Sequence, residues 1–481
     1  MTIVVVGYGM AGSRVVEQLR ARNEHEPVIA FGAEPYAAYN RVLLSRVLAG
    51  EASAEDIRLA ATTSGATTVR TGVTVTEIDR DAREVVADDG SRTGYDTLVL
   101  ATGSQPVVPP LAGLVTDGSG ELLPGAAVFR TVADCQNIIE AAQDAKRAVV
   151  LGGGLLGLEA ARGLAGRGLS VEVLHAADHL MDRQLDAAAG RVLARTLAGL
   201  GVRVRLGARA QAVRGADRVR GVALADGTVL DADLLVLACG VRPEVSLARR
   251  AGLTVETGVV VDDALRSVDD PAVYAVGECA QHDGQVYGLV APAWEQATVV
   301  ADQLSGADPQ ARYRGSRIVT RLKAAGVELA AMGQTQPGEE DPDGAEVLHF
   351  CDPARGTYKK LVLRDDRVVG AILLGEISTV ATVTQLYDRG TPAPADRLRL
   401  LFHSHRNGGG PPESPTGDVT VCHCNGVAAE TIEACWRAGA HTVTEIAQQT
   451  RATTGCGGCR GQVAGIVARL SSNTTSGGVY Q

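Results

Sequence analysis

Four cysteines near the C-terminal end of the chain have the spacing of ligands for a metal ion or an iron–sulfur cluster. They form the pattern Cys422-x-Cys424, then 31 intervening residues, then Cys456-x-x-Cys459. Four thiolates can hold either Zn²⁺ or a [2Fe–2S] cluster. Structural zinc sites more often use two pairs with longer spacing, so the Cys-x-Cys pair points away from zinc. Glycines beside the second pair leave backbone N–H groups free to approach sulfur, which stabilises an anionic cluster.

A glycine-rich turn at the start of the chain has the pattern that binds the pyrophosphate of a dinucleotide. Residues 2–6 form a short β-branched apolar run, residues 7–12 read GYGMAG, and residues 13–20 have helical spacing. Strand, glycine turn and helix in this order bring close backbone and free helix N–H groups to a pyrophosphate. Glu34 follows a second predicted strand, residues 28–31, where an acid can bind a ribose hydroxyl. We therefore favour a dinucleotide site over a purely structural role for these glycines.

The same unit occurs a second time in the middle of the chain. Residues 148–151 form a buried strand, residues 152–157 read GGGLLG, residues 158–169 continue as a helix, and residues 171–174 form the next strand. Two complete units predict two dinucleotides. One is expected to be a tightly held flavin and the other an exchangeable nicotinamide nucleotide.

Three further turns follow predicted buried strands and bring backbone close to a ligand. Residues 96–101 lead into Thr102 and Gly103, and residues 233–239 lead into Gly240. Residues 272–276 lead into Gly277 and Glu278. The Glu278 carboxylate is placed to accept a hydrogen bond from a flavin ribityl hydroxyl, or to act as a helix N-cap, and these two roles are compatible.

Length and composition indicate a soluble protein of several domains. The chain has 481 residues, 45% hydrophobic and 21% charged, with no apolar run long enough to span a membrane. Its net charge of −10 argues against a nucleic-acid partner. The first strand starts at residue 2 without a signal-peptide flank, so we expect a cytoplasmic protein and no membrane partner. Five scattered cysteines are expected to be small buried hydrophobes: Cys135, Cys239, Cys279, Cys351 and Cys435.

These motifs, in this order, resemble those of the two-dinucleotide pyridine-nucleotide oxidoreductases, in which the nicotinamide domain is inserted into the flavin domain. The resemblance implies an α/β fold with two Rossmann-like dinucleotide-binding domains, a third α+β domain and a small helical [2Fe–2S] domain. The expected boundaries are 1–113 and 240–306 for the FAD-binding domain, 114–239 for the NAD(P)-binding domain, 312–403 for the α+β domain, 406–418 for a linker, 419–470 for the [2Fe–2S] domain and 471–481 for a disordered tail.

The four-cysteine segment resembles the bacterioferritin-associated ferredoxin-like domain in its Cys-x-Cys-Asn start, its spacing and its Gly-Cys-Gly-Gly-Cys end. Behind a flavoprotein, this resemblance strongly favours a [2Fe–2S] cluster over zinc. The domain order and the local runs at 39–45, 180–186, 287–292 and 323–327 resemble two groups of proteins. One is the N-terminal half of bacterial assimilatory NAD(P)H nitrite reductase large subunits, and the other is the electron-transfer subunit of assimilatory nitrate reductases.

This resemblance implies an FAD-dependent NAD(P)H oxidoreductase that passes electrons from NADH to FAD, then to [2Fe–2S], then to a partner. The expected partner is the molybdenum-containing catalytic subunit of an assimilatory nitrate reductase, or a nitrite reductase. A sirohaem nitrite reductase needs more cysteines after the [2Fe–2S] domain, and none follows Cys459, so we expect this chain not to reduce nitrite itself. Residues 34–50 contain no cysteine, which excludes disulfide exchange at the flavin. Two alternatives are a stand-alone NADH oxidase or peroxidase and a subunit whose cluster is a structural or regulatory sensor.

The resemblance also implies roles for individual residues. FAD is expected to be held by Gly7, Gly9, Ala11, Gly12, Glu34, Arg41, Arg46, Val75, Thr102, Gly103, Arg130, Gly277 and Glu278. The nicotinamide nucleotide is expected to be held by Gly152, Gly154, Gly157, Glu159, His175 and Gly240. Arg46 stands where ferredoxin-reductase relatives carry a lysine near the flavin. We take Arg46 and Glu159 as the candidate catalytic residues, although Arg46 and Arg130 would equally suit a solvated helix face.

The residue after the second strand of the nicotinamide unit bears on the choice between NADH and NADPH. An acid there binds the ribose 2′-hydroxyl of NADH, whereas a nearby arginine accommodates the phosphate of NADPH. Here the position is His175, and no lysine or arginine follows until Arg183. Asp178 would repel the phosphate. The sequence therefore predicts a preference for NADH.

Overall fold

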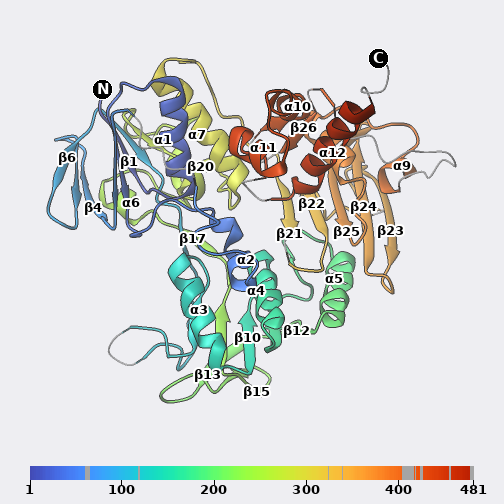
Figure 1. The fold of residues 1–481 in the computed structure, drawn as a ribbon. Helices are drawn as coiled ribbons and strands as arrows, with labels where there is room; N and C mark the ends of the chain where they lie inside the picture. Colours follow the sequence, from blue (N-terminus) through green and yellow to red (C-terminus); the bar gives the residue numbers. More distant parts are fainter. Residues whose placement is uncertain are drawn as a thin grey trace. The chain divides into compact units, whose positions relative to one another are not determined.

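The computed structural model describes residues 1–59, 65–116, 120–322, 324–338, 340–402, 416–417, 419–422, 426–453 and 457–476 (Figure 1). The chain forms two compact units. The first unit consists of Met1–Val42, Ala54–Gln105 and Val241–Ser316, and the second of Leu43–Ser53, Pro106–Gly240 and Arg317–Gln481.

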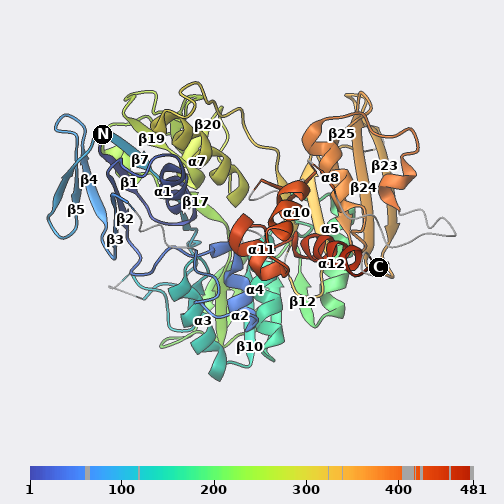
Figure 2. The ribbon, with the colours of Figure 1, turned by 45° about the horizontal axis from the view of Figure 1, so that its top comes forward.

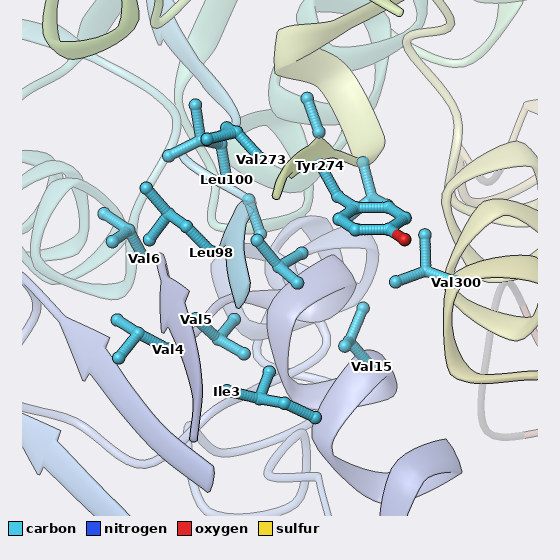
Figure 3. Packing of buried hydrophobic residues seen from close by; sticks show 14 of the residues in the cluster. Ile3, Val4, Val5, Val6, Val15, Leu98, Leu100, Val273, Tyr274 and Val300 are labelled. Atoms are coloured by element: carbon cyan, nitrogen blue, oxygen red, sulfur yellow. The ribbon is translucent and has the colours of Figure 1, made fainter. Parts of the chain in front are cut away.

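A parallel five-stranded sheet forms the centre of the first unit. Its inner strands, Ile3–Val6 and Thr97–Leu100, are almost continuous apolar runs buried on both faces, as expected for a covered parallel sheet. Figure 3 shows Ile3, Val4 and Val5 of the central strand, with Val15 and Val300 from the two covering helices. These helices, α1 (Met10–Arg22) and α7 (Val290–Ser305), lie side by side in both views (Figures 1 and 2). The sheet order is β19 (Val273–Ala275), β7 (Thr97–Leu100), β1 (Ile3–Val6), β2 (Val28–Gly32), β3 (Thr67–Thr71).

Smaller elements complete the first unit. An antiparallel sheet is formed by β4 (Val75–Asp79), β5 (Glu84–Ala87) and β6 (Arg92–Gly94), and a parallel pair by β18 (Val259–Val261) and β20 (Ala280–His282). The helices are η1 (Arg41–Leu43), α6 (Ser246–Arg250) and η2 (Gly277–Cys279), and the strand segments β8 (Ser104–Pro106) and β17 (Val241–Pro243) lie at the unit boundaries.

The second unit contains another parallel five-stranded sheet. Its order is β12 (Val202–Arg205), β11 (Ser170–Leu174), β10 (Arg147–Leu151), β16 (Leu234–Leu237), β9 (Ala126–Val128). The helices around it are α2 (Leu44–Ala49), α3 (Val132–Asp144), α4 (Leu155–Gly166) and α5 (Ala187–Gly199). An antiparallel sheet follows, formed by β13 (Ala210–Arg214), β14 (Gly221–Leu224) and β15 (Val229–Asp231).

An antiparallel five-stranded sheet follows within the second unit. Its order is β21 (Val319–Leu322), β22 (Leu329–Gly333), β25 (Arg367–Leu374), β24 (Thr357–Arg364), β23 (Glu346–Asp352). Helix α8 (Val380–Arg389) packs on β25 and β22, and α9 (Leu398–Leu401) contacts β24. Buried Leu361, Leu373 and Val383 belong to one apolar core between the sheet and α8.

The C-terminal part of the second unit is small and mainly helical. The hairpin β26 (Thr420–Cys422) and β27 (Val427–Ala428) precedes α10 (Ala429–Arg437), α11 (Val443–Thr450) and α12 (Arg460–Ser476). The three helices contact one another (Figure 2). The α/β class, with two Rossmann-type sheets, a third mixed domain and a small helical domain, is confirmed.

Several predicted element bounds were wrong. The first helix begins at Met10, not at residue 13, and the second begins at Leu155, not at residue 158, because each starts directly after the middle glycine of its turn. The second helix ends at Gly166 instead of residue 169, since Gly168 has a φ of +91°. Residues 471–476 continue α12, so this part of the predicted tail is helical.

Two further observations concern predictions from composition. Cys351 is exposed, contrary to the prediction that it is buried, because β23 is an edge strand of its sheet. Among the described residues, no helix combines the length and hydrophobicity that a bilayer crossing requires.

Leu43–Ser53, assigned by sequence to the FAD-binding domain, lies in the second unit because α2 contacts α3 and α4. The domain boundaries remain predictions, and the predicted linker lies mostly outside the described residues.

Candidate functional site

The glycines of the first turn have two different reasons to be glycine. Gly7 has a φ of +102°, and a Cβ there would overlap the carbonyl oxygen of Ala101. A Cβ on Gly12 would overlap the carbonyl oxygen of Gly7, so these two glycines are required by the packing of turn on strand. A Cβ on Gly9, in contrast, would meet no heavy atom within 4 Å, and its backbone (φ −83°, ψ −156°) suits any residue. The fold therefore leaves open space at Gly9, which a closely approaching ligand explains.

The same end of α1 is suited to an anion. Gly9 is the N-cap and has no side chain to cap the helix, and the first turn contains no acidic residue. A helix N-terminus carries a partial positive charge and N–H groups that bind phosphate. The space in front of Gly9 therefore fits the pyrophosphate of a dinucleotide. Ala11 lies within the same first turn, and a Cβ on Gly277 would lie 2.9 Å from the Ala11 Cβ.

The second glycine turn repeats this arrangement. Gly152 has a φ of +125°, and a Cβ there would overlap the carbonyl oxygen of Ala238. A Cβ on Gly157 would overlap the carbonyl oxygen of Gly152. Gly154 is the N-cap of α4, has an extended backbone (φ −85°, ψ −179°) and has no heavy atom within 4 Å of a Cβ position. Both turns thus leave the middle glycine facing open space, which fits two dinucleotides.

Glu34 lies after β2, where a ribose-binding acid is expected. Its two carboxylate oxygens accept hydrogen bonds from Arg41 Nη2 at 2.6 Å and from Tyr39 Oη at 2.7 Å. Each carboxylate oxygen can accept more than one hydrogen bond, so Glu34 stays available to a hydroxyl. The predicted residues Glu34 and Arg41 are brought together, and Tyr39 is an orienting residue that the sequence analysis missed. The sequence did contain a signal for Tyr39, since a tyrosine hydroxyl only five residues after the acid can reach its carboxylate.

The other predicted flavin-site residues of the first unit lie at strand ends. Gly103 has a φ of +70° and open space at its Cβ position, while the Thr102 hydroxyl donates to the Glu244 carbonyl at 2.6 Å. Glu278 accepts a hydrogen bond from the Ser104 hydroxyl at 2.5 Å. Glu278 lies in η2 and is not the N-cap of a long helix, since α7 starts only at Val290.

Ser104 was missed because it is 174 residues from Glu278, although it directly follows the predicted Thr-Gly turn. Gly277 has a φ of +79°, and its N–H donates to Gln296 Oε1 at 2.7 Å. This bond ties the acid-bearing turn to α7. Val75 starts β4 and is buried.

The remaining predicted flavin and nicotinamide residues belong to the second unit. Arg46 forms an ion pair with Glu51 at 3.3 Å, and both side chains are nearly half exposed. Arg130 directly precedes Thr131, the N-cap of α3, and its N–H donates to Asp134 at 2.9 Å. Glu159 is buried within α4, and Gly240 has a φ of +100° with open space at its Cβ position. Their contacts with a cofactor remain predictions.

His175 holds the second glycine turn. The Gly153 N–H donates to His175 Nδ1 at 3.2 Å, so Nδ1 is unprotonated and the proton of the neutral ring lies on Nε2. Nε2 lies 3.1 Å from Asp182 Oδ1, which accepts a hydrogen bond from the Nε2–H group. Both ring nitrogens are therefore engaged within the protein. Asp182 places an acid beside the turn, and sequence reasoning missed it because the acid lies seven residues after the strand-end position.

Two of the four predicted cluster ligands can be placed. Cys422 ends β26 and is fully buried, and Cys459 directly precedes α12 and is 5% exposed. Cys424 and Cys456 lie outside the described residues. Two buried thiols at the ends of short elements fit a sulfur-ligated cluster.

Of the other cysteines, Cys135, Cys239, Cys279 and Cys435 have the character of protonated hydrophobes, whereas Cys351 is exposed. Burial raises the pKa of the Cys135 and Cys239 thiols to about 11. Burial also raises the pKa of Cys435, whose thiol donates to Gln449 Oε1 at 3.1 Å. A raised pKa disfavours the thiolate that a metal requires.

Comparison with known proteins agrees with this geometry. The family model described as pyridine nucleotide-disulphide oxidoreductase matches residues 1–297, and the rubredoxin NAD+ reductase C-terminal domain matches residues 319–391. The BFD-like [2Fe-2S] binding domain matches residues 420–469. These matches show that the chain binds FAD and NAD(H) and carries a [2Fe–2S] cluster.

Curated relatives match nearly the whole chain. Nitrite reductase [NAD(P)H] of Bacillus subtilis (strain 168) is 38% identical over 466 residues, covering 95% of this chain and 56% of the relative. The assimilatory nitrate reductase electron transfer subunit of the same organism is 36% identical over 476 residues, covering 98% of this chain and 60% of the relative. The chain thus spans little more than half the length of these relatives.

Among solved structures, the covalent putidaredoxin reductase–putidaredoxin complex matches with a TM-score of 0.75 and 26% identity, covering 84% of this chain and 96% of that chain. The matched fold is that of a flavin- and nicotinamide-dependent oxidoreductase. Since the family model extends from before β1 into α7, over residues 1–297 of 481, the chain belongs to the pyridine nucleotide-disulphide oxidoreductase family.

Proposed function

We propose that this chain is an NADH-dependent electron-transfer subunit that passes electrons through FAD and [2Fe–2S] to a partner reducing nitrate or nitrite. The observation that carries the proposal is the pair of open middle glycines, Gly9 and Gly154, in a chain whose helical C-terminal part holds buried Cys422 and Cys459. The relative named as the electron transfer subunit of assimilatory nitrate reductase covers 98% of this chain, which supports nitrate reductase as the first candidate partner.

The FAD site that we propose combines the first glycine turn with the ends of β2, β7 and β19. Gly9 and the α1 N-terminus would hold the pyrophosphate, and Glu34 would accept from the adenosine ribose while Tyr39 and Arg41 fix its carboxylate. Glu278, oriented by Ser104, would accept from a ribityl hydroxyl. The roles of Arg46 and Arg130, which belong to the second unit, rest on the sequence resemblance alone.

The nicotinamide site that we propose lies at the second glycine turn. Gly154 and the α4 N-terminus would hold the pyrophosphate, and Gly152 and Gly157 shape the turn. Glu159 on α4 and Gly240 after β16 are further candidates for this site. When bound, the cofactors supply hydride transfer from NADH to FAD and single-electron transfer through [2Fe–2S]. The chain binds and orients these groups.

The preference for NADH is also part of the proposal. A phosphate at the adenine ribose would meet a turn held by His175, which bonds Asp182, and Asp178 belongs to the same segment. Asp178 keeps its charge, because its hydrogen bond from His179 holds the pKa of the carboxyl below its usual value. Two acids in this segment, without a lysine or arginine before Arg183, disfavour a phosphate that carries almost two negative charges.

The experiment separates the flavin step from the cluster step. Cys456→Ser is compared with Cys435→Ser, a variant of a buried cysteine in the same domain that is not a predicted ligand. We expect Cys456→Ser to lose the cluster absorbance and the reduction of a purified molybdenum-containing nitrate reductase, while NADH still bleaches the flavin anaerobically. Cys435→Ser should retain all three properties.

Two results would contradict the proposal. A folded, FAD-loaded Cys456→Ser variant that reduces the partner at the wild-type rate would remove the cluster from the electron path. Rapid NADH-driven oxygen consumption by the wild-type protein, with no electron transfer to either a nitrate or a nitrite reductase, would instead support a stand-alone oxidase.

A further inference from the structure

The segment between β11 and α5, residues 175–186, packs directly on the second glycine turn. A Cβ on Gly153 would lie 2.6 Å from Leu180 Cδ2 and 2.7 Å from His175 Cγ, so the turn and this segment are in close contact. The Met181 N–H donates to the Gly153 carbonyl at 3.0 Å, and the Gly153 N–H donates to His175 Nδ1 at 3.2 Å. We call residues 175–186 the β11–α5 segment. Its position fixes Gly153, the neighbour of Gly154.

The other end of the β11–α5 segment is held by a different domain. Asp186 Oδ2 accepts hydrogen bonds from Lys360 Nζ at 2.8 Å and from Tyr358 Oη at 2.7 Å. Both donors lie on β24 of the five-stranded antiparallel sheet. Gln336 Nε2 donates to the Leu185 carbonyl at 2.9 Å. Helix α5 and β24 are in contact (Figure 1). Three side chains of the antiparallel sheet region therefore hold the segment that contacts the nucleotide turn.

The charges make this contact specific. Lys360 is 4% exposed, and its ammonium also donates to the Thr335 carbonyl at 2.8 Å, so the buried cation is satisfied only with Asp186 in place. Asp186 simultaneously caps α5 by accepting from the Ala189 N–H at 2.9 Å. Breaking one partner of a buried ion pair leaves an uncompensated charge, so the pair strongly favours one position of the segment.

We propose that Lys360 is a positioning residue for the nicotinamide nucleotide: through Asp186 it holds the β11–α5 segment against the second glycine turn and thereby sets the affinity for NADH. The inference rests on the proposed nicotinamide site at that turn. It makes the antiparallel sheet domain a determinant of nucleotide binding, although Lys360 is more than 200 residues from the glycine turn in sequence.

The adjacent lysine on the same strand provides a matched control. Lys359 is 0% exposed and lies on the opposite face of β24, because side chains alternate along a strand. Its ammonium donates to the Leu401 carbonyl at 2.5 Å and to Glu376. Removing Lys359 therefore deletes a buried cation from the same strand but leaves the Asp186 contact intact.

The test compares Lys360→Met with Lys359→Met in the full chain loaded with FAD and cluster. ADP-ribose is titrated calorimetrically, and kcat and KM for NADH are measured with ferricyanide as acceptor. For Lys360→Met we expect the ADP-ribose Kd and the NADH KM to rise about 10-fold, with kcat changed less than about 2-fold. A change of about 10-fold lies within the range of coupling energies measured between residues in contact. Lys359→Met should change neither constant more than about 2-fold, whatever its effect on thermal stability.

Two further variants keep the outcomes distinct. Gly154→Ala tests the nucleotide site itself: wild-type ADP-ribose binding by this variant would refute the proposed site, whereas loss of binding supports it. If Gly154→Ala loses binding and folded Lys360→Met does not, the positioning role alone is refuted. If Lys360→Met does not fold, the double variant Lys360→Met, Asp186→Asn replaces it, since asparagine still caps α5 and no unpaired charge remains. Unchanged ADP-ribose affinity in that double variant would overturn the proposal.

Discussion

Substitution of the middle glycine of the first turn tests the assignment of the flavin site most directly. In Gly9→Ala the added Cβ meets no protein atom within 4 Å, and the backbone conformation at φ −83° is allowed for alanine. The protein itself should therefore tolerate the methyl group. Only a ligand that approaches the backbone of Gly9 would be displaced by it.

The expected magnitudes follow from opposing effects. Replacing glycine by alanine at a compatible position stabilises by about 0.4–1 kcal/mol through the unfolded state. Alanine is a poorer N-cap than glycine by up to about 1 kcal/mol, so the net change in stability should be close to zero. Loss of one charge-assisted hydrogen bond from the pyrophosphate costs about 1.5–3 kcal/mol, which corresponds to a weakening of FAD binding by about 10- to 100-fold.

The assay measures FAD affinity and fold stability separately. FAD is removed, the Kd for added FAD is determined from quenching of flavin fluorescence, and the Tm of the FAD-free protein is recorded. Gly12→Ala is the matched control, because its Cβ would overlap the carbonyl oxygen of Gly7. We expect Gly12→Ala to lose both stability, by about 2 kcal/mol or more, and FAD binding. We expect Gly9→Ala to lose FAD binding alone.

Wild-type FAD affinity in Gly9→Ala would refute the reasoning, since the open space at Gly9 would then have no connection with the flavin. A large fall in the Tm of the FAD-free Gly9→Ala protein would refute it in another way. It would mean that the fold requires glycine at this position.

Three further outcomes are expected. Anaerobically purified protein should contain about one FAD and about two each of iron and acid-labile sulfide per chain, and stoichiometric zinc without sulfide would contradict the cluster assignment. Ala176→Arg should shift the preference from NADH toward NADPH, measured as kcat/KM for both nucleotides at pH 6 to 8; a wild-type NADPH advantage at pH 8 would refute the NADH preference. Burial would raise the pKa of Asp186, but bonds from the Ala189 N–H, Lys360 and Tyr358 outweigh it and hold the pKa below its usual value. The resulting stability is present above the unfolded pKa of about 3.9 and is lost as the pH falls through the lower folded pKa. Asp186→Asn should therefore be less stable at pH 7 yet lose less Tm between pH 5 and 3 than the wild type, and equal acid sensitivity of the two proteins would contradict this.

The sequence alone determined the features that depend on local pattern. Buried parallel strands such as residues 2–6 are continuous apolar runs, and the two glycine turns have fixed spacing, so fold class and the positions of both turns could be predicted. The spacing of the cysteines likewise predicted a cluster domain that the family match supports. Helix starts were misplaced by three residues because glycine at an N-cap lacks the polar side chain that marks most helix starts.

Only the tertiary structure decided which glycines the protein needs and which polar groups meet. Gly9 and Gly12 belong to the same sequence motif, so the sequence does not distinguish them. The space available to a Cβ at each position depends on which atoms the fold places opposite it. Ser104 meets Glu278, and Asp186 meets Lys360, each across 174 residues, so no local pattern could predict either pair. The reason is physical: hydrophobic periodicity is a property of neighbouring residues, whereas hydrogen bonds and ion pairs between domains exist only once the chain has folded.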